Sequence, residues 1–119
     1  MNFDAAVEAH MAWKIKFRVA MQNRQQLDEA AIGRDNCCEL GKWLHGEGSV
    51  RHGGLPSFGP CQQRHAEFHR EAAQVAHAIN RGEFARAEAL LGPSSGYSGA
   101  SGAVVLMLGK LRREIEATA

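Results

Sequence analysis

The sequence lacks a surplus of charge of either sign and has no long hydrophobic run. Its formal net charge at pH 7 is only +1. This value argues against a nucleic acid or an acidic membrane surface as the partner, because both bind strongly basic proteins. The longest apolar run, Ala103 to Leu108, is far shorter than the roughly 20 residues that a membrane-spanning helix needs. We therefore expect neither nucleic-acid binding nor a membrane span.

Cysteine is also scarce, with three residues in the whole chain. The N-terminus carries acidic residues early and lacks the apolar core of a signal peptide, so we expect a cytoplasmic location. In that reducing compartment a disulfide framework is not expected. Cys37 and Cys38 are adjacent and poorly placed to bond each other. Cysteine combined with histidine then points to metal or redox chemistry.

Aromatic residues and β-branched runs are few as well, whereas alanine is abundant and the apolar residues recur with a helical period. This pattern predicts an all-α fold, an antiparallel four-helix bundle with an additional short helix, formed by a single domain over residues 1–119. Asp35 or Asn36 is the expected N-cap of the second helix. We expect irregular loops between the second and third helices and in GPSSGYSGASG, residues 92–102. The expected helices cover residues 3–24, 36–46, 60–81, 84–91 (the short one) and 102–117.

The stretch HAEFH, residues 65 to 69, places two histidines on one face of the third helix, because residues four apart share a face. Both lie on the apolar stripe of that helix, and His10 lies on the apolar stripe of the first. A lone histidine in such a place is most simply a core residue with one hydrogen bond. Three buried histidines need three partners, however, and one zinc ion would supply them all. Cys38, on the second helix, offers a fourth ligand.

Hydrolytic chemistry is disfavoured at this site. The HExxH zinc-protease motif needs glutamate directly after the first histidine, where this chain has Ala66. Glu67 lies about 200° around the helix from His65 and should face solvent. Phe68 precedes His69, so the inverted motif is absent too. Four protein ligands would leave no open position for water, and we therefore do not expect an enzyme or catalytic residues.

Three segments together resemble one known family. HMAW begins at His10, CELGKW begins at Cys38, and HAEFH spans residues 65 to 69. These segments are similar to the histidine–aromatic element, the Cys-x-Leu-Gly-x-Trp element and the His-x-x-x-His pair of the bacterial chemoreceptor zinc-binding (CZB) domain. The resemblance extends over residues 5 to about 115, and it implies that a Zn²⁺ ion is held by His10, Cys38, His65 and His69.

The resemblance also implies a function. Members of that family are four-helix regulatory modules of cytoplasmic signalling proteins, fused to chemoreceptor regions or to diguanylate cyclases, or free-standing. They respond to zinc and in some cases to hypochlorous acid, through the zinc-bound cysteine, which makes Cys38 the expected redox switch. The expected outputs are chemotaxis or cyclic-di-GMP signalling through a partner in cis or in trans. The alternative is a purely structural zinc in an interaction or dimerisation module.

Other residues have supporting or open roles. Gly41 would allow close approach of a neighbouring helix or the metal. Trp13, Trp43 and Phe68 are expected to pack around the site and keep water out. Cys61 could neighbour the metal, although a small buried core residue is the simpler interpretation. Some family members dimerise, and the apolar strip of Met11 and Ile15 is a candidate contact for a homodimer.

Overall fold

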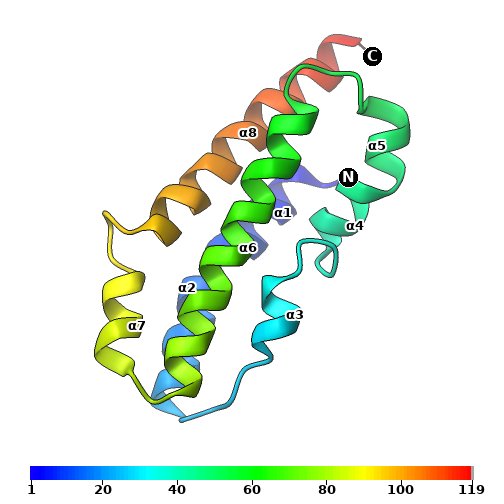
Figure 1. The fold of residues 1–119 in the computed structure, drawn as a ribbon. Coiled ribbons are helices and arrows are strands. Elements are labelled where there is room, and N and C mark those ends of the chain that lie inside the picture. The colour runs from blue at the N-terminus through cyan, green and yellow to red at the C-terminus, as the bar shows by residue number, and fades with distance from the viewer. Residues whose placement is uncertain (119) are drawn as a thin grey trace.

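A computed structural model describes residues 1–118 of the chain. Within that range it contains helices and no strand, which confirms the predicted all-α bundle. Figure 1 shows four arms of alternating direction: α1 with α2, α3 to α5 returning, α6 running with the first arm, and α7 with α8 returning. The helices are α1 (Phe3–Met11), α2 (Trp13–Gln22), α3 (Glu29–Gly33), α4 (Glu39–His45), α5 (Glu47–His52), α6 (Phe58–Asn80), α7 (Phe84–Leu90) and α8 (Gly96–Thr118).

The central element is α6, which contacts α2, α3, α4, α7 and α8. Its predicted inward stripe is buried at every position, since residues three or four apart share one helical face. Each large apolar side chain removed from water contributes roughly 1.5–3 kcal/mol before the loss of conformational entropy. The stripe comprises Cys61, His65, Phe68, His69, Ala72, Val75, Ala76 and Ile79.

The first predicted helix is divided at Ala12. Its backbone still has helical angles, and its N–H donates to Glu8 O while its C=O accepts from Lys16 N–H. The first arm is therefore one nearly continuous rod, as the period of its apolar residues predicts. Phe17 and Ala20 are buried on the same side of this rod as His10 and Ala6.

The second arm differs most from the sequence-based prediction. Its main helix begins at Glu39 and not at residue 36, and Cys38, not Asp35 or Asn36, is the N-cap. Two further short helices, α3 and α5, were not predicted. Asp28 caps α3 by accepting from Ala31 N–H, 3.1 Å away. Gly48 allows α5 to form because an added Cβ would lie 2.7 Å from the Trp43 ring.

The prediction of a loop over residues 92–102 is wrong, because α8 already begins at Gly96. Ser95 Oγ accepts from Ser98 N–H at 3.1 Å, which supplies an N-cap. Tyr97 is buried, with its ring centroid 5.4 Å from that of Phe68. This cap and this aromatic packing offset the glycines of the segment, each of which disfavours a helix by about 1 kcal/mol relative to alanine.

No helix within residues 1–118 is both long enough and apolar enough to cross a bilayer.

Candidate metal centre

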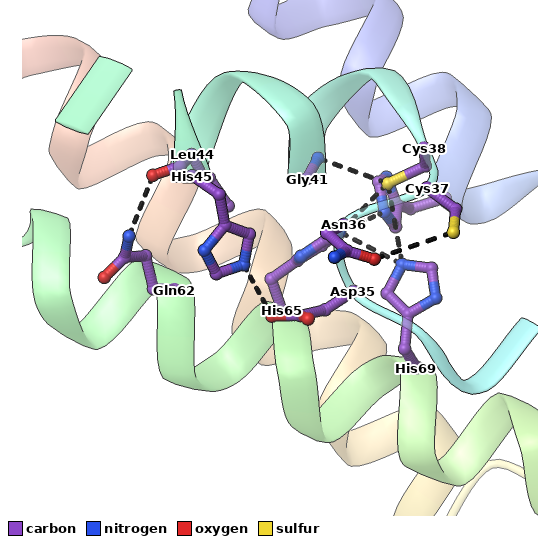
Figure 2. A network of polar contacts seen from close by, with 11 residues as sticks. Asp35, Asn36, Cys37, Cys38, Gly41, Leu44, His45, Gln62, His65 and His69 are labelled. Carbon is purple, nitrogen blue, oxygen red and sulfur yellow. Dashed lines mark hydrogen bonds and ion pairs between the residues drawn. The ribbon is translucent and has the colours of Figure 1, made fainter. Parts of the chain in front are cut away.

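Three arms of the bundle bring the four predicted ligand residues together. His65 and His69 lie one turn apart on α6, His10 lies near the end of α1, and Cys38 precedes α4. The three histidines are almost fully buried, with at most 2% of each exposed, and Cys38 is partly buried. Figure 2 shows the Cys38 sulfur above the imidazole of His69 and beside His65. Residues distant in sequence therefore share one small polar centre inside an apolar core.

The distances between the donor atoms suit a tetrahedral metal site. His65 Nε2 lies 3.1 Å from His10 Nε2 and 3.0 Å from His69 Nε2. Cys38 Sγ lies 3.2 Å from His65 Nε2 and 3.6 Å from His69 Nε2, and all four ligand atoms lie within 4.8 Å of one another. In a tetrahedral site with nitrogen at about 2.05 Å and sulfur at about 2.3 Å, ligand atoms are about 3.3–3.6 Å apart. A slight expansion of the cluster would reach those values.

The outer nitrogens of two histidines fix which atoms face the centre. His10 Nδ1 lies 2.7 Å from Ala6 O, and His69 Nδ1 lies 2.8 Å from Ile32 O. A carbonyl oxygen only accepts, so each Nδ1 must carry the proton and donate it. Each neutral ring then presents the lone pair of Nε2 to the centre. Backbone acceptors of this kind are the usual partners of metal-bound histidine, because they fix its tautomer and orientation.

His65 cannot satisfy this arrangement by itself. Its Nε2 faces the Nε2 lone pairs of His10 and His69 and can donate at most one proton. Its Nδ1 is buried and has no hydrogen-bond partner. A buried polar atom left unpaired costs about 1–3 kcal/mol. Three converging nitrogens with too few protons are stabilised by a cation, so the residues present fit a bound metal ion.

The electrostatics favour ligand protonation states that a metal can use. Burial, followed by repulsion from His69 and His10, lowers the pKa of His65 to about 3. Burial also lowers the pKa values of His10 and His69, so all three rings are neutral at pH 7. Burial raises the pKa of the Cys38 thiol, and the N–H groups of Gly41 and Leu40 oppose that shift. A bound cation would favour the thiolate, so binding releases a proton.

The segment before α4 is shaped to present Cys38. Its sulfur accepts from Gly41 N–H at 3.3 Å, so one atom both caps the helix and faces the histidines. A Cβ on Gly41 would lie 1.8 Å from Asp35 O, which shows why glycine occupies this position. The expected close approach at Gly41 is therefore made by the backbone of the preceding turn. Asp35 also accepts from His45 Nε2 at 2.9 Å, which closes this turn across α4.

The aromatic residues predicted around the site differ in position. The Phe68 ring packs edge-on against His10 and His69, with centroids 5.1 and 5.4 Å away. Trp43 packs against Phe3 and Phe58 and shares a cavity with His10 and Cys38. The ring of Trp13 packs on Phe17, with centroids 5.3 Å apart. Phe68 thus contacts the cluster directly.

The remaining predicted residues lie outside the cluster. Cys61 is fully buried among apolar side chains, and the group of candidate ligands found in residues 1–118 does not contain it. Cys37 is exposed, and its sulfur lies 3.6 Å from Asn36 Oδ1. Glu67 pairs with Arg64 at 3.0 Å on the outer side of α6, so it does not take part in the site.

Sequence reasoning missed the groups that orient the ligands. These are Ala6 O, Ile32 O and the Asp35–His45 pair. A backbone carbonyl has no side-chain signature, and Ile32 belongs to a helix that the sequence pattern did not indicate. The spacing of Asp35 and His45 could have suggested their pair, but only with the start of α4 placed correctly.

Comparison with known proteins identifies the family. The chemoreceptor zinc-binding domain matches residues 10–76, which is more than half of the chain and includes all four clustered residues. No curated protein and no solved structure matches the chain. Domains of this family are regulatory and bind zinc, in keeping with the donor set and geometry of the cluster. The chain thus belongs to the chemoreceptor zinc-binding domain family.

Proposed function

We propose that the chain is a cytoplasmic zinc-binding sensory domain in which His10, Cys38, His65 and His69 hold one Zn²⁺. The observation that carries this proposal is the convergence of three Nε2 atoms and one sulfur inside the bundle. Three imidazoles and one thiolate suit zinc, which prefers nitrogen and sulfur ligands in a tetrahedron. With four protein ligands the site has no open position for a reacting water, which supports regulation and not catalysis.

Cys38 has two roles in this proposal. When zinc is bound, it holds the sulfur as a thiolate, which is both a metal ligand and a nucleophile. Oxidation of that sulfur to a sulfenic acid weakens it as a ligand. Hypochlorous acid would transfer its oxygen to the thiolate and leave as chloride. Both low zinc and an oxidant therefore act on the same contact.

The element released by that change is α4 with its preceding turn. Apart from Cys38, its polar connection to α6 is Gln62 Nε2, which donates to Leu44 O at 2.8 Å. The arm also includes the short helices α3 and α5, which are too short to be stable alone. Loss of the sulfur contact should loosen this arm before the rest of the bundle, and a signalling partner could read that change.

The partner in this proposal is a chemoreceptor or a diguanylate cyclase, in cis or in trans, with chemotaxis or cyclic-di-GMP as the output. A homodimer is part of the proposal. The strip predicted for its contact, Met11 and Ile15, is 61% and 67% exposed, and Val19 extends it along α2. Apolar side chains aligned in this way on one exposed face are what a helical dimer contact needs.

A structural zinc is the second candidate function. The near-complete burial of the three histidines favours it, because a deeply enclosed ion exchanges slowly and mainly contributes folding energy. In that case the domain would be a permanent interaction module. The two functions differ in the zinc affinity and in the response of the bound ion to oxidants.

Zinc release during oxidation tests the sensory function. Zinc-loaded wild-type protein, Cys38→Ser and the matched control Cys37→Ser would be titrated with hypochlorous acid while a chromogenic chelator reports free zinc. We expect one zinc per chain, stoichiometric release from the wild type and Cys37→Ser, and weaker zinc binding without an oxidant response in Cys38→Ser. Zinc that stays bound in the oxidised wild type would favour the structural function.

A further inference from the structure

A largely apolar cavity of about 530 Å³ lies between α1 and α4, next to the metal centre. Its walls include Ala5, Ala9, Leu40 and Trp43, and the ligand residues His10 and Cys38 also line it. The lining residues carry one carboxylate, that of Glu39, and include no lysine or arginine. This is the one large apolar hollow found in residues 1–118 that reaches two of the four clustered residues.

We propose that this cavity is the entrance through which small uncharged molecules reach the Cys38 sulfur, and that its lining excludes anions. The proposal deepens the proposed function, because it assigns the class of reagent to which the sulfur responds. The three histidines are buried, whereas Cys38 is partly exposed and lies on the cavity wall. A reagent that enters the cavity therefore meets the sulfur as the accessible reactive atom of the cluster.

The selectivity follows from the lining. An anion that leaves water for an apolar wall loses hydration without a compensating partner. The exposed carboxylate of Glu39, which follows Cys38 directly, repels it further. An uncharged molecule of the same size meets neither penalty. A bound dication would by itself attract anions, so a preference for uncharged reagents must come from the cavity.

Two alkylating reagents of nearly equal size test this selectivity. Iodoacetamide is uncharged and iodoacetate is an anion, and each transfers its carbon to a thiolate with loss of iodide. The ratio of their rates at one sulfur does not depend on how much of that sulfur is thiolate. Cys37, exposed and one residue away, is an internal reference in a similar long-range field, and buried Cys61 reports unfolding.

The rates would be measured by mass spectrometry of peptides from the protein as purified, with its zinc content determined on the same sample. We expect the iodoacetamide-to-iodoacetate rate ratio at Cys38 to exceed that at Cys37 by about tenfold, because only the Cys38 route desolvates the anion. Glu39→Gln should lower this excess by about two- to threefold, because its carboxylate supplies part of the repulsion. Equal ratios at the two cysteines would overturn the proposal.

A cavity-filling variant tests the route itself. Ala9→Leu places a larger side chain in the cavity from an exposed position of α1, and leucine is a good helix former. We expect it to slow iodoacetamide at Cys38 by about fivefold or more and to leave Cys37 unchanged, because the added volume narrows the entrance. Ala85→Leu, an exposed change on α7 away from the cavity, should change neither rate. An unchanged Cys38 rate in Ala9→Leu would also overturn the proposal.

This outcome is separate from that of the proposed function. Absence of bound zinc would refute the metal site, whereas the alkylation ratios judge the entrance whether or not zinc is bound. Zinc bound together with equal ratios would leave the metal site standing and refute the entrance.

Discussion

Helix α6 is joined to the first half of the chain at two polar places, and the two use opposite chemistry. At its C-terminal end, Asn80 Nδ2 donates to Leu27 O and to Glu29 Oε2, both at 2.8 Å, and Asn80 Oδ1 accepts from Leu27 N–H at 2.7 Å. Donors and acceptors are matched within the protein. Near its middle, His65 and His69 meet His10 and Cys38 with lone pairs facing lone pairs.

The difference shows what each join requires. The amide join around Asn80 is complete as it stands, so it should persist in any condition under which the chain is folded. The histidine–cysteine join lacks protons for its nitrogens and leaves His65 Nδ1 unpaired, so it is stable only with a cation at its centre. A chain that combines both can stay folded at one place while the other opens.

Metal removal should separate the two joins most strongly. In the chelated protein we expect the amides of α4, residues 39–45, to exchange hydrogen more than about 100-fold faster, because zinc binding energy is also folding energy. The amide of Leu27, held by Asn80, should change by less than about twofold, because its hydrogen bond does not involve the metal. Hydrogen-exchange mass spectrometry with and without a chelator measures both. Equal acceleration at the two places would contradict the comparison, since it would mean that the whole bundle depends on the metal.

Alanine substitution at each join should have opposite profiles. His69→Ala should weaken zinc binding by more than about 100-fold, since it removes a ligand and not only an outer partner. Asn80→Ala should lower the free energy of unfolding by about 2–3 kcal/mol because it leaves the N–H and C=O of Leu27 unpaired. Its zinc affinity should stay within about threefold of the wild type, since independent sites act separately. Competitive zinc titration and urea unfolding test these values, and a large loss of zinc affinity in Asn80→Ala would show that the joins are coupled.

The two joins should also respond to pH in different ranges. In the metal-free protein, the folded-state pKa of His65, about 3, lies below the value of 6.5 for an unfolded chain. The unfolded state therefore binds more protons below pH 6.5, and the stability present above that pH is lost as the pH falls. From pH 7 to pH 5 the free energy of unfolding should drop by about 2 kcal/mol from His65 alone.

At the other join the shift has the opposite consequence for the pH range. Hydrogen bonds from Asn80 and His77 lower the pKa of Glu29, so its contribution is present above about pH 4.5 and is lost only as the pH falls below that value. Urea unfolding of the metal-free protein at pH 7, 6 and 5 measures the first effect, and His65→Gln should remove most of it. A pH-independent stability over this range would mean that the three rings are not buried in neutral form.

Two glycine substitutions provide a smaller and more local test. Gly41→Ala should destabilise the fold by about 1–3 kcal/mol, because the new Cβ meets Asp35 O and pushes the Cys38 turn away. Gly99→Ala is the matched control, since no atom lies within 4 Å of its added Cβ, and it should stabilise α8 by up to about 1 kcal/mol. Thermal unfolding measures both variants, and zinc titration should show weaker binding only in Gly41→Ala. A neutral Gly41→Ala would mean that the turn is not tightly positioned.

The sequence was sufficient to predict the parts of the fold that repeat regularly. The buried stripe of α6 and the rod of α1 with α2 follow from residues three and four apart, and the same spacing placed His65 and His69 on one inward face. His10 could be found because it lies on such a stripe as well. Cys38 was found through its CELGKW segment, whose resemblance to a known family the match over residues 10–76 bears out.

Other features depend on contacts that no local pattern contains. The helix at Gly96 forms in a glycine-rich segment because Tyr97 reaches Phe68, which lies in another arm. The N-cap role of Cys38 arises because the Asp35 turn passes over Gly41. The carbonyl of Ile32 is placed by α3, a helix too short for its period to be recognised. Tertiary packing decides each of these positions.

X-ray absorption at the zinc edge of the purified, zinc-loaded chain tests the central claim most directly. The account predicts one zinc per chain with four ligands, three nitrogens at about 2.0–2.1 Å and one sulfur at about 2.3 Å, and loss of the sulfur contribution in Cys38→Ser. A shell without sulfur in the wild-type protein, or with a fifth light-atom ligand from water, would contradict a closed site made by His10, Cys38, His65 and His69.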